Sequence, residues 1–183
     1  MTSGHGIAEL LSSLEPNAAR RALVRCCASS RWVEAMVRAR PFVDDAAVYA
    51  AAERIWGALD APDWLEAFAA HPRIGEDRER LRARFAEAAW SSKEQAGVAS
   101  ASEATLAALA AGNRDYAARF GHVFLVCATG KSAAEMLAAL RARLTNDPAA
   151  ELRVAAGEQM KITKLRLAKL VDERTVVGDL GGR

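Results

Sequence analysis

No segment of this chain alternates apolar and polar residues in the way that a half-buried β-strand does. Apolar residues occupy 51% of the 183 positions, which is enough for a sizeable core, and alanine contributes much of that fraction. Because alanine is the strongest helix former and lets helices pack closely, the sequence predicts an all-α fold. We expect a single-domain bundle of roughly eight to nine helices. The tryptophans should face its core, at Trp32, Trp56, Trp64 and Trp90.

Prolines, glycines and polar capping residues predict where the helices begin and end. Pro16 is tolerated in a first helical turn, Pro41 stops a helix, and Gly121 closes one. The expected helices cover residues 15–28, 30–40, 44–59, 62–71, 76–90, a segment that begins at Ser91 or Ser92, 102–120, 131–144 and 146–171. The apolar segment between Gly121 and Gly130 is assigned to neither a helix nor a strand. Residues 172–183 are polar and contain glycines, so we expect a mobile tail after a domain over residues 1–171.

Charge and cysteine usage exclude several classes of partner. The formal net charge is +2 and the basic residues are dispersed, whereas nucleic-acid-binding proteins carry a clustered basic surface. Cys26 and Cys27 are adjacent, Cys127 stands apart, and no Cys-x-x-Cys pair occurs, so we expect no disulfide framework, no metal site and a reducing compartment. Apolar runs such as residues 123–128 are too short to cross a membrane.

Targeting signals are absent from both ends of the sequence. Residues 1–14 lack the basic and apolar regions of a signal peptide, and Gly181-Gly182-Arg183 is not a peroxisomal address. We therefore expect a cytoplasmic protein with no membrane partner. The alanine- and arginine-rich composition favours a bacterial source.

His71 is the candidate catalytic residue. It is one of three histidines, and it opens the stretch His71-Pro72-Arg73-Ile74-Gly75. Because a proline interrupts helices, we expect the histidine to be presented from a turn rather than along a solvated helix face. Imidazole has an ordinary pKa of about 6.5, so a histidine in such a position can exchange protons at cellular pH.

Ser91, Glu94 and Gln95 form a second candidate cluster. A serine followed three residues later by a glutamate is a capping box, which orders a helix start and needs no further role. The free N–H groups of a helix start also attract anions. With a carboxylate and an amide nearby, the same cluster could hold a small anionic molecule, and the sequence leaves both interpretations open.

Three other features have structural explanations. Gly130-Lys131-Ser132 is similar to the end of a phosphate loop, but that loop requires glycine at position 125, where this chain has Leu125. We therefore expect a turn and a helix start there. His122 follows a helix end beside apolar residues, and we expect it to be packed or solvated rather than catalytic. Arg166 lies in a basic run between Lys161 and Lys169 that is typical of a solvated helix face.

Four sets of residues, taken in order, resemble the 2-oxo-4-hydroxy-4-carboxy-5-ureidoimidazoline (OHCU) decarboxylase family. The likeness extends over nearly the whole chain, to about Val171. Each motif alone is weak, whereas the four together are specific. The sets are His71-Pro72-Arg73-Ile74-Gly75; Ser91-x-x-Glu94-Gln95; Asn113-x-x-Tyr116 with Arg119-Phe120-Gly121 and Phe124-Leu125-Val126-Cys127-Ala128; and Arg143-Leu144 with Asn146, Glu151, Glu158, Ile162 and Arg166-Leu167.

The resemblance implies an all-helical, homodimeric enzyme that converts OHCU to (S)-allantoin and CO2 in urate degradation. It implies that His71 and Glu94 are catalytic. Two departures from the family stand out: His122 occupies a place where an aromatic residue is more common, and the stretch between Gly75 and Ser91 differs in length among members. The implied substrate-binding residues are Pro72, Ser91, Gln95, Arg166 and, through their backbone, Phe124, Leu125, Val126, Cys127 and Ala128.

The chemistry of the implied substrate explains why no cofactor is expected. Its carboxylate sits on a ring carbon next to a C=N bond, which can accept the electron pair left by departing CO2. The protein must hold the carboxylate perpendicular to the ring and manage the protons. Our hypothesis is that His71, polarised by Glu94, takes or orients the proton of the ring hydroxyl. Which of these two residues protonates the intermediate stays open. Arg166 would bind polar oxygens of the substrate, and Gln95 with Ser91 would hold its ureido and ring amides.

Two alternatives remain at this point. A non-catalytic helical module that binds a ligand or a partner would show the same apolar helix faces and the same conspicuous turn. An enzyme of the same scaffold could act on a different substrate, and His122 leaves room for that. Turnover of OHCU, with optical detection of the chirality of the allantoin formed, separates all three.

Overall fold

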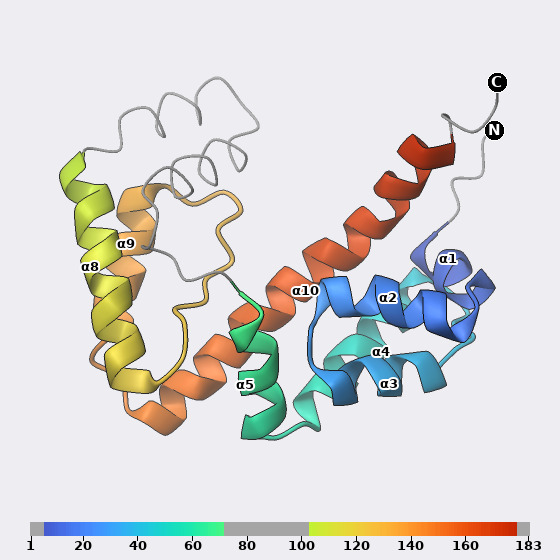
Figure 1. Cartoon of the computed structure of the whole chain (residues 1–183), viewed down its shortest axis with the longest axis horizontal. Coiled ribbons are helices and arrows are strands. Elements are labelled where there is room, and N and C mark those ends of the chain that lie inside the picture. The colour runs from blue at the N-terminus through green and yellow to red at the C-terminus, as the bar shows by residue number, and fades with distance from the viewer. Residues whose placement is uncertain (1–5, 72–102, 179–183) are drawn as a thin grey trace. The chain divides into compact units, whose positions relative to one another are not determined.

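The computed structural model of the chain describes residues 6–71 and 103–178 (Figure 1). These residues form eight helices and no strand, which confirms the all-α prediction. The helices, numbered as in Figure 1, are α1 (Ile7–Ser13), α2 (Pro16–Cys26), α3 (Ser30–Arg38), α4 (Asp45–Gly57), α5 (Ala61–Ala69), α8 (Glu103–Phe120), α9 (Ala133–Arg143) and α10 (Pro148–Gly178). No helix among the described residues is both long and apolar enough to cross a membrane.

Local capping interactions explain where several helices begin. The Ser29 side chain accepts a hydrogen bond from the Trp32 N–H at 3.4 Å, and the Asp44 carboxylate accepts one from the Ala47 N–H at 2.7 Å. The Ser29 hydroxyl caps α3 and the Asp44 carboxylate caps α4. Each satisfies a backbone N–H group that has no partner within its own helix. Gly121 and Gly130 have φ values of +75° and +73°, a region that side chains disfavour, so each ends or redirects the chain at little cost.

Two helices depart from the sequence-based expectation by more than a residue or two at their ends. Helix α1 was not predicted, because it has no capping side chain. It is held instead by a contact distant in sequence, since its Ala8 N–H donates to the Asp45 carboxylate at 2.9 Å. Helix α10 continues to Gly178 instead of ending near Val171. Charged residues such as those at 172–174 are compatible with a helix, and the first glycine after Gly157 is Gly178. The division into a domain and a tail at residue 171 stays a prediction.

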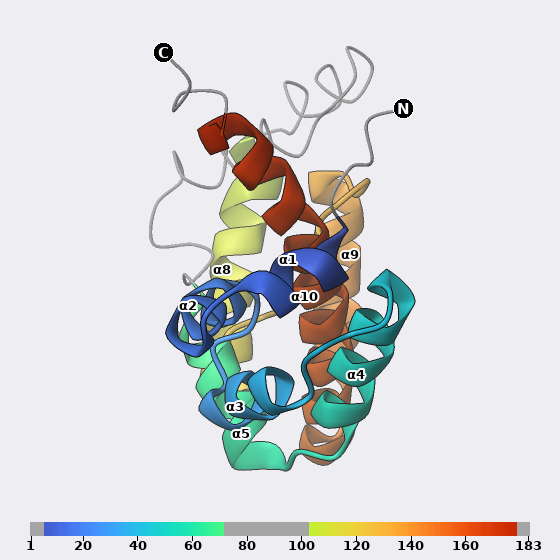
Figure 2. The same ribbon diagram turned by 90° about the vertical axis from the view of Figure 1, so that its right-hand side faces the viewer.

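The chain divides into two compact units, Met1–Ala67 with Gln159–Arg183, and Phe68–Glu158. In the first unit α1 packs on α4, α2 on α3, and α3 on α4 (Figure 2). Its core contains Trp32, which is fully buried and donates its indole N–H to the Ala52 carbonyl at 3.2 Å. Trp56 is also buried, as expected, while Trp64 is half-buried and Trp90 lies outside the described residues.

The second unit is built on the pair α8 and α9. The two helices run in the same direction, and the segment between them returns along the pair before α9 begins (Figure 1). Gly112 lets the helices approach closely, because a Cβ atom there would lie 2.6 Å from Cδ2 of the buried Leu140. The core of this unit contains residues from both helices and from the returning segment: Leu106, Leu109, Tyr116, Phe124, Val126, Ala133, Met136 and Leu140.

Candidate active site

His71 lies immediately after α5, where the sequence predicts a turn. The helix ends at Ala69, and the backbone N–H of His71 donates to the Phe68 carbonyl at 3.0 Å. The side chain is 7% exposed, so it is not spread along a solvated surface. A general acid or base must lie within hydrogen-bond reach of the proton that it moves, and a buried imidazole at a helix end could take that role toward a bound molecule.

Several predicted site residues fall outside the described part of the chain. These are Pro72 and the cluster Ser91, Glu94 and Gln95, together with the helices expected over residues 76–90 and from Ser91 or Ser92. Their capping and substrate-binding interpretations therefore stay predictions. The same holds for the expected contact between His71 and Glu94.

The segment from Phe124 to Ala128 is irregular and largely buried. Phe124, Leu125 and Val126 are 2%, 3% and 6% exposed, and Cys127 and Ala128 are half-buried. The segment forms neither a helix nor a strand, a conformation that its sequence pattern did not predict. Since irregular backbone leaves peptide groups without the bonds of a helix or a sheet, such a segment can offer N–H and C=O groups to a ligand.

A buried polar network lies beside this segment. Glu151 is fully buried, and its Oε1 accepts hydrogen bonds from Nε and Nη2 of Arg143 at 2.7 and 2.6 Å. Its Oε2 accepts from Nδ2 of Asn146 at 2.7 Å. The Tyr116 hydroxyl also donates to Glu151. Burial, followed by the hydrogen bond to this carboxylate, raises the pKa of Tyr116, so the phenol stays protonated.

The network also reaches the backbone of the segment. Nη1 of Arg143 donates to the Leu125 carbonyl at 2.6 Å. Two residues further along the segment, a carboxylate oxygen of Glu158 accepts from the Cys127 N–H at 2.6 Å. Arg143, Glu151 and Glu158 are among the residues that carry the family resemblance, which implies no role for them. Charged residues are abundant in this chain, and only their burial distinguishes these three.

His122 is part of an aromatic cluster. Its ring centroid lies 5.3 Å from that of Phe68, 5.4 Å from that of Tyr116 and 6.2 Å from that of Phe120. Its Nδ1–H donates to the Val123 carbonyl at 3.1 Å. Burial lowers the pKa of His122, so the residue is a neutral aromatic ring. Of the two surroundings expected for His122, packed or solvated, the structure shows the packed one, and the expectation that His122 is not catalytic stays a prediction. Phe68 links the cluster to the turn that carries His71.

Arg166 lies on α10 in the first unit, whereas His71 and residues 124–128 belong to the second. Its side chain is half-buried, and Nη1 donates to the Cys26 carbonyl at 3.4 Å and to the Arg25 carbonyl at 3.5 Å. Both carbonyls belong to the last turn of α2, so the guanidinium group lies at the negative end of that helix. A purely solvated helix face does not describe this position, and a role for Arg166 toward substrate stays a prediction.

The turn at Gly130-Lys131-Ser132 has the structural role expected of it. The Ser132 hydroxyl accepts from the Glu135 N–H at 3.2 Å, and the Glu135 carboxylate accepts from the Ser132 N–H at 2.7 Å. The two bonds form a capping box that starts α9. Among the described residues, no group of three or more histidine, cysteine, aspartate or glutamate side chains could hold a metal ion.

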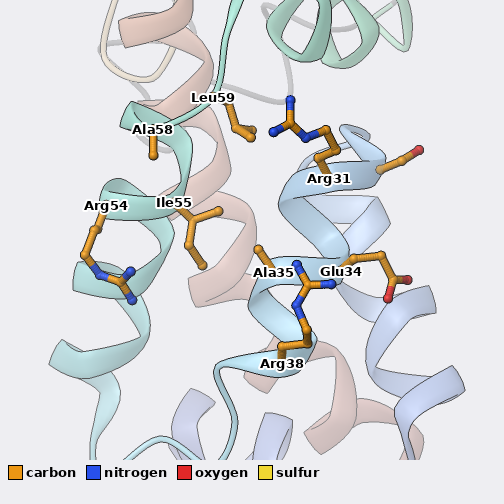
Figure 3. A pocket seen from close by; sticks show the side chains of 9 residues that line it. Arg31, Glu34, Ala35, Arg38, Arg54, Ile55, Ala58 and Leu59 are labelled. Atoms are coloured by element: carbon orange, nitrogen blue, oxygen red, sulfur yellow. The ribbon is translucent and has the colours of Figure 1, made fainter.

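A cavity of about 520 Å³ lies between α3 and α4 in the first unit (Figure 3). Ile55, Ala35 and Leu59 provide apolar lining, while Arg38 and Arg54 lie at its edge. Arg31 also borders it and forms an ion pair with Asp63 at 2.7 Å. Of the predicted active-site residues that lie in the described ranges, none lines this cavity.

Comparisons with known proteins agree on one family. The family model of OHCU decarboxylase matches residues 12–168. The chain is 40% identical over 153 residues to the uric acid degradation bifunctional protein TTL of Arabidopsis thaliana, a match that covers 83% of this chain and 47% of that protein. It is 41% identical over 59 residues to 2-oxo-4-hydroxy-4-carboxy-5-ureidoimidazoline decarboxylase of Amia calva, covering 32% of this chain and 34% of that protein. The chain thus spans about half the length of the first of these relatives and less of the second.

Solved structures show the same fold. A crystal structure of OHCU decarboxylase in the presence of (S)-allantoin matches with a TM-score of 0.67 and 38% identity, over 87% of this chain and 99% of that one. A crystal structure of (S)-allantoin synthase matches with a TM-score of 0.66 over 87% of this chain and 52% of that one. At 21% identity, the second likeness concerns the fold alone.

Proposed function

Because the chain belongs to the OHCU decarboxylase family, we propose that it is a cofactor-independent carboxy-lyase that converts OHCU to (S)-allantoin and CO2 in urate degradation. The match of the family over residues 12–168 carries the proposal. The burial of His71 in the same compact unit as residues 124–128 supports it further. A non-catalytic binding module would need neither a buried imidazole at a helix end nor the family's motifs in order.

The reaction requires the protein to orient one bond and move protons. When the C–CO2 bond breaks, its electron pair forms a ring C=C bond, and the adjacent C=N bond opens toward its nitrogen, which takes up a proton. His71, polarised by Glu94, takes or orients the proton of the ring hydroxyl, which becomes the carbonyl of the product. The neighbouring ring carbon then gains a proton on one face, which gives a single enantiomer. General acid–base assistance of this kind contributes about 10²–10⁴-fold in rate.

The remaining candidate residues bind the substrate. Peptide groups of residues 124–128 form a hydrogen-bonding wall along the ring and the ureido group. Ser91 and Gln95 hold the amides, and Pro72 lies beside the catalytic histidine in sequence. Arg166 binds polar oxygens through its guanidinium group, whose planar fork of N–H donors suits carboxylate and carbonyl oxygens. Held in this way, the carboxylate stays perpendicular to the ring, so that the breaking bond overlaps the π system.

The test is a direct assay on OHCU made freshly from urate. The wild-type chain should accelerate the loss of ultraviolet absorbance and yield optically active allantoin, measured by circular dichroism. His71→Ala should lose the acceleration while keeping the helical spectrum. His5→Ala is the matched control, because His5 lies outside the family match. Binding of (S)-allantoin without turnover of OHCU would favour the non-catalytic module, and turnover retained by His71→Ala would reject the role of His71.

We also propose that the enzyme is a cytoplasmic homodimer. The dimer is supported by the family resemblance, and light scattering after gel filtration should give twice the chain mass of 19.6 kDa. The compartment is supported by cysteine usage, since none of Cys26, Cys27 and Cys127 forms a disulfide. A monomeric mass at the protein concentration of the assay would reject the dimer.

A further inference from the structure

We propose that Arg143 is a positioning residue of the active site, which holds residues 124–128 in the conformation that binds substrate. The proposal rests on the proposed function, because that function assigns the segment to the substrate. Arg143 does not itself act on the reacting atoms. It acts through the backbone that it holds, from the last turn of α9.

Arg143 contacts the segment in two places. Nη1 donates to the Leu125 carbonyl at 2.6 Å, and the guanidinium carbon lies 4.6 Å from the centroid of the Phe124 ring. One contact fixes a peptide plane and the other fixes the side chain that precedes it. A planar guanidinium can make both contacts at once, whereas the ammonium of lysine is a point donor that cannot stack in this way.

The guanidinium is itself held in place. Its Nε and Nη2 donate to the same oxygen of Glu151, at 2.7 and 2.6 Å, and Nη2 lies 3.2 Å from the Tyr116 hydroxyl. The Arg143 side chain is only 11% exposed and that of Glu151 is fully buried. Because a buried ion pair with these bonds has one favourable geometry, Nη1 has one direction in which to point.

These bonds determine which peptide groups remain for a ligand. The Leu125 carbonyl accepts a hydrogen bond from Arg143. The Cys127 N–H donates to Glu158, and the Cys127 carbonyl accepts from Nζ of Lys131 at 3.0 Å. Between them lies Val126, which is 6% exposed. Neither its N–H nor its carbonyl bonds to any residue in the described ranges 6–71 and 103–178. Buried peptide groups are nearly always paired, so a bound molecule is the fitting partner for those of Val126.

The experiment compares Arg143→Lys with Arg141→Lys. Arg141 lies on the same helix, is exposed, and forms no side-chain bond to the described residues, so its variant controls for the change of cation. Arg143→Lys should raise KM for OHCU about tenfold, the size expected from losing one or two binding hydrogen bonds, with kcat changed much less. A merely structural role would lower the melting temperature and the active fraction but leave KM unchanged, because KM does not depend on enzyme concentration.

Amide hydrogen exchange of the enzyme without substrate gives a second, activity-free readout. The Val126 and Ala128 amides should exchange faster in Arg143→Lys than in wild type or Arg141→Lys. If Arg143→Lys does not fold, Glu151→Gln provides the same test, since it keeps the acceptor oxygen but removes the charge that orients the guanidinium. Wild-type KM together with wild-type exchange in the folded variant would overturn the proposal. A wild-type enzyme that does not turn over OHCU would instead reject the proposed function, and the exchange rates would still decide whether Arg143 holds the segment.

Discussion

Replacing Gly112 by alanine tests how closely α8 and α9 pack. A Cβ atom at this position would lie 2.6 Å from Cδ2 and 3.3 Å from Cγ of Leu140. Leu140 is fully buried, so its side chain cannot move into solvent to make room. The substitution therefore forces a shift of the helix pair or an unfavourable rotamer of the leucine.

Two opposing effects set the size of the change. Overpacking a core costs about 1–3 kcal/mol, whereas alanine is about 1 kcal/mol better than glycine inside a helix. Gly112→Ala should therefore lower the free energy of unfolding by about 0–2 kcal/mol. Gly157→Ala isolates the second effect, because Gly157 is an exposed position in α10 and a Cβ atom there has no neighbour within 4 Å. That variant should be stabilised by about 1 kcal/mol.

The measurement is urea unfolding of both variants, followed by helical circular dichroism. Their free energies of unfolding should differ by about 1–3 kcal/mol, with Gly112→Ala the less stable. At about 2–4 °C per kcal/mol for a chain of this size, thermal melting should give the same order. If Gly112→Ala is stabilised as much as Gly157→Ala, the close approach of α8 and α9 at this position is wrong.

Two further predictions concern groups with shifted pKa values. Because burial lowers the pKa of His122 from 6.5, the unfolded chain binds this proton before the folded chain does as the pH falls. The free energy of unfolding of wild type, relative to that of His122→Phe, should therefore be constant above pH 6.5 and decline below it. Urea unfolding at several pH values measures this difference. A difference that is independent of pH would mean that His122 is not buried as described. Ser132→Ala should lower the free energy of unfolding by about 1 kcal/mol through loss of the α9 cap, while Ser132→Thr should retain most of it. Hydrogen bonds to Ser132 lower the pKa of Glu135. The ionised Glu135 carboxylate therefore stabilises the folded state above the ordinary glutamate pKa of 4.5, and this stabilisation is lost as the pH falls through the lowered pKa.

Helix positions could be predicted where the deciding interactions are local. The capping box of Ser132 and Glu135 and the stop at Gly121 are visible within a few residues of sequence. Helix α1 was missed because its start depends on Asp45, which lies 37 residues from Ala8. Sequence patterns within one segment contain no information about such a partner.

In the candidate site, too, only the features that depend on neighbouring residues in sequence could be predicted. The position of His71 at the end of α5 follows from the proline that comes next, a local signal. Tyr116, Arg143 and Glu151 meet only because α8, α9 and the start of α10 fold together, since Tyr116 and Glu151 are 35 residues apart. In sequence, Arg143 is indistinguishable from the exposed Arg141, because burial and not residue type gives it its partners. For Arg166, the basic run in the sequence predicted a solvent-exposed side chain. In the fold, its guanidinium group instead contacts the end of α2.

His122 was the reason for the alternative that the enzyme acts on a different substrate. That alternative was based on a histidine where relatives more often have an aromatic side chain. In the fold, His122 contacts the rings of Phe68, Tyr116 and Phe120 and is held neutral by burial. A neutral imidazole in such surroundings packs as an aromatic ring, with one N–H satisfied by the Val123 carbonyl. The substitution therefore preserves the cluster that adjoins both His71 and the segment beginning at Phe124, and it supplies no new charge with which to select another substrate.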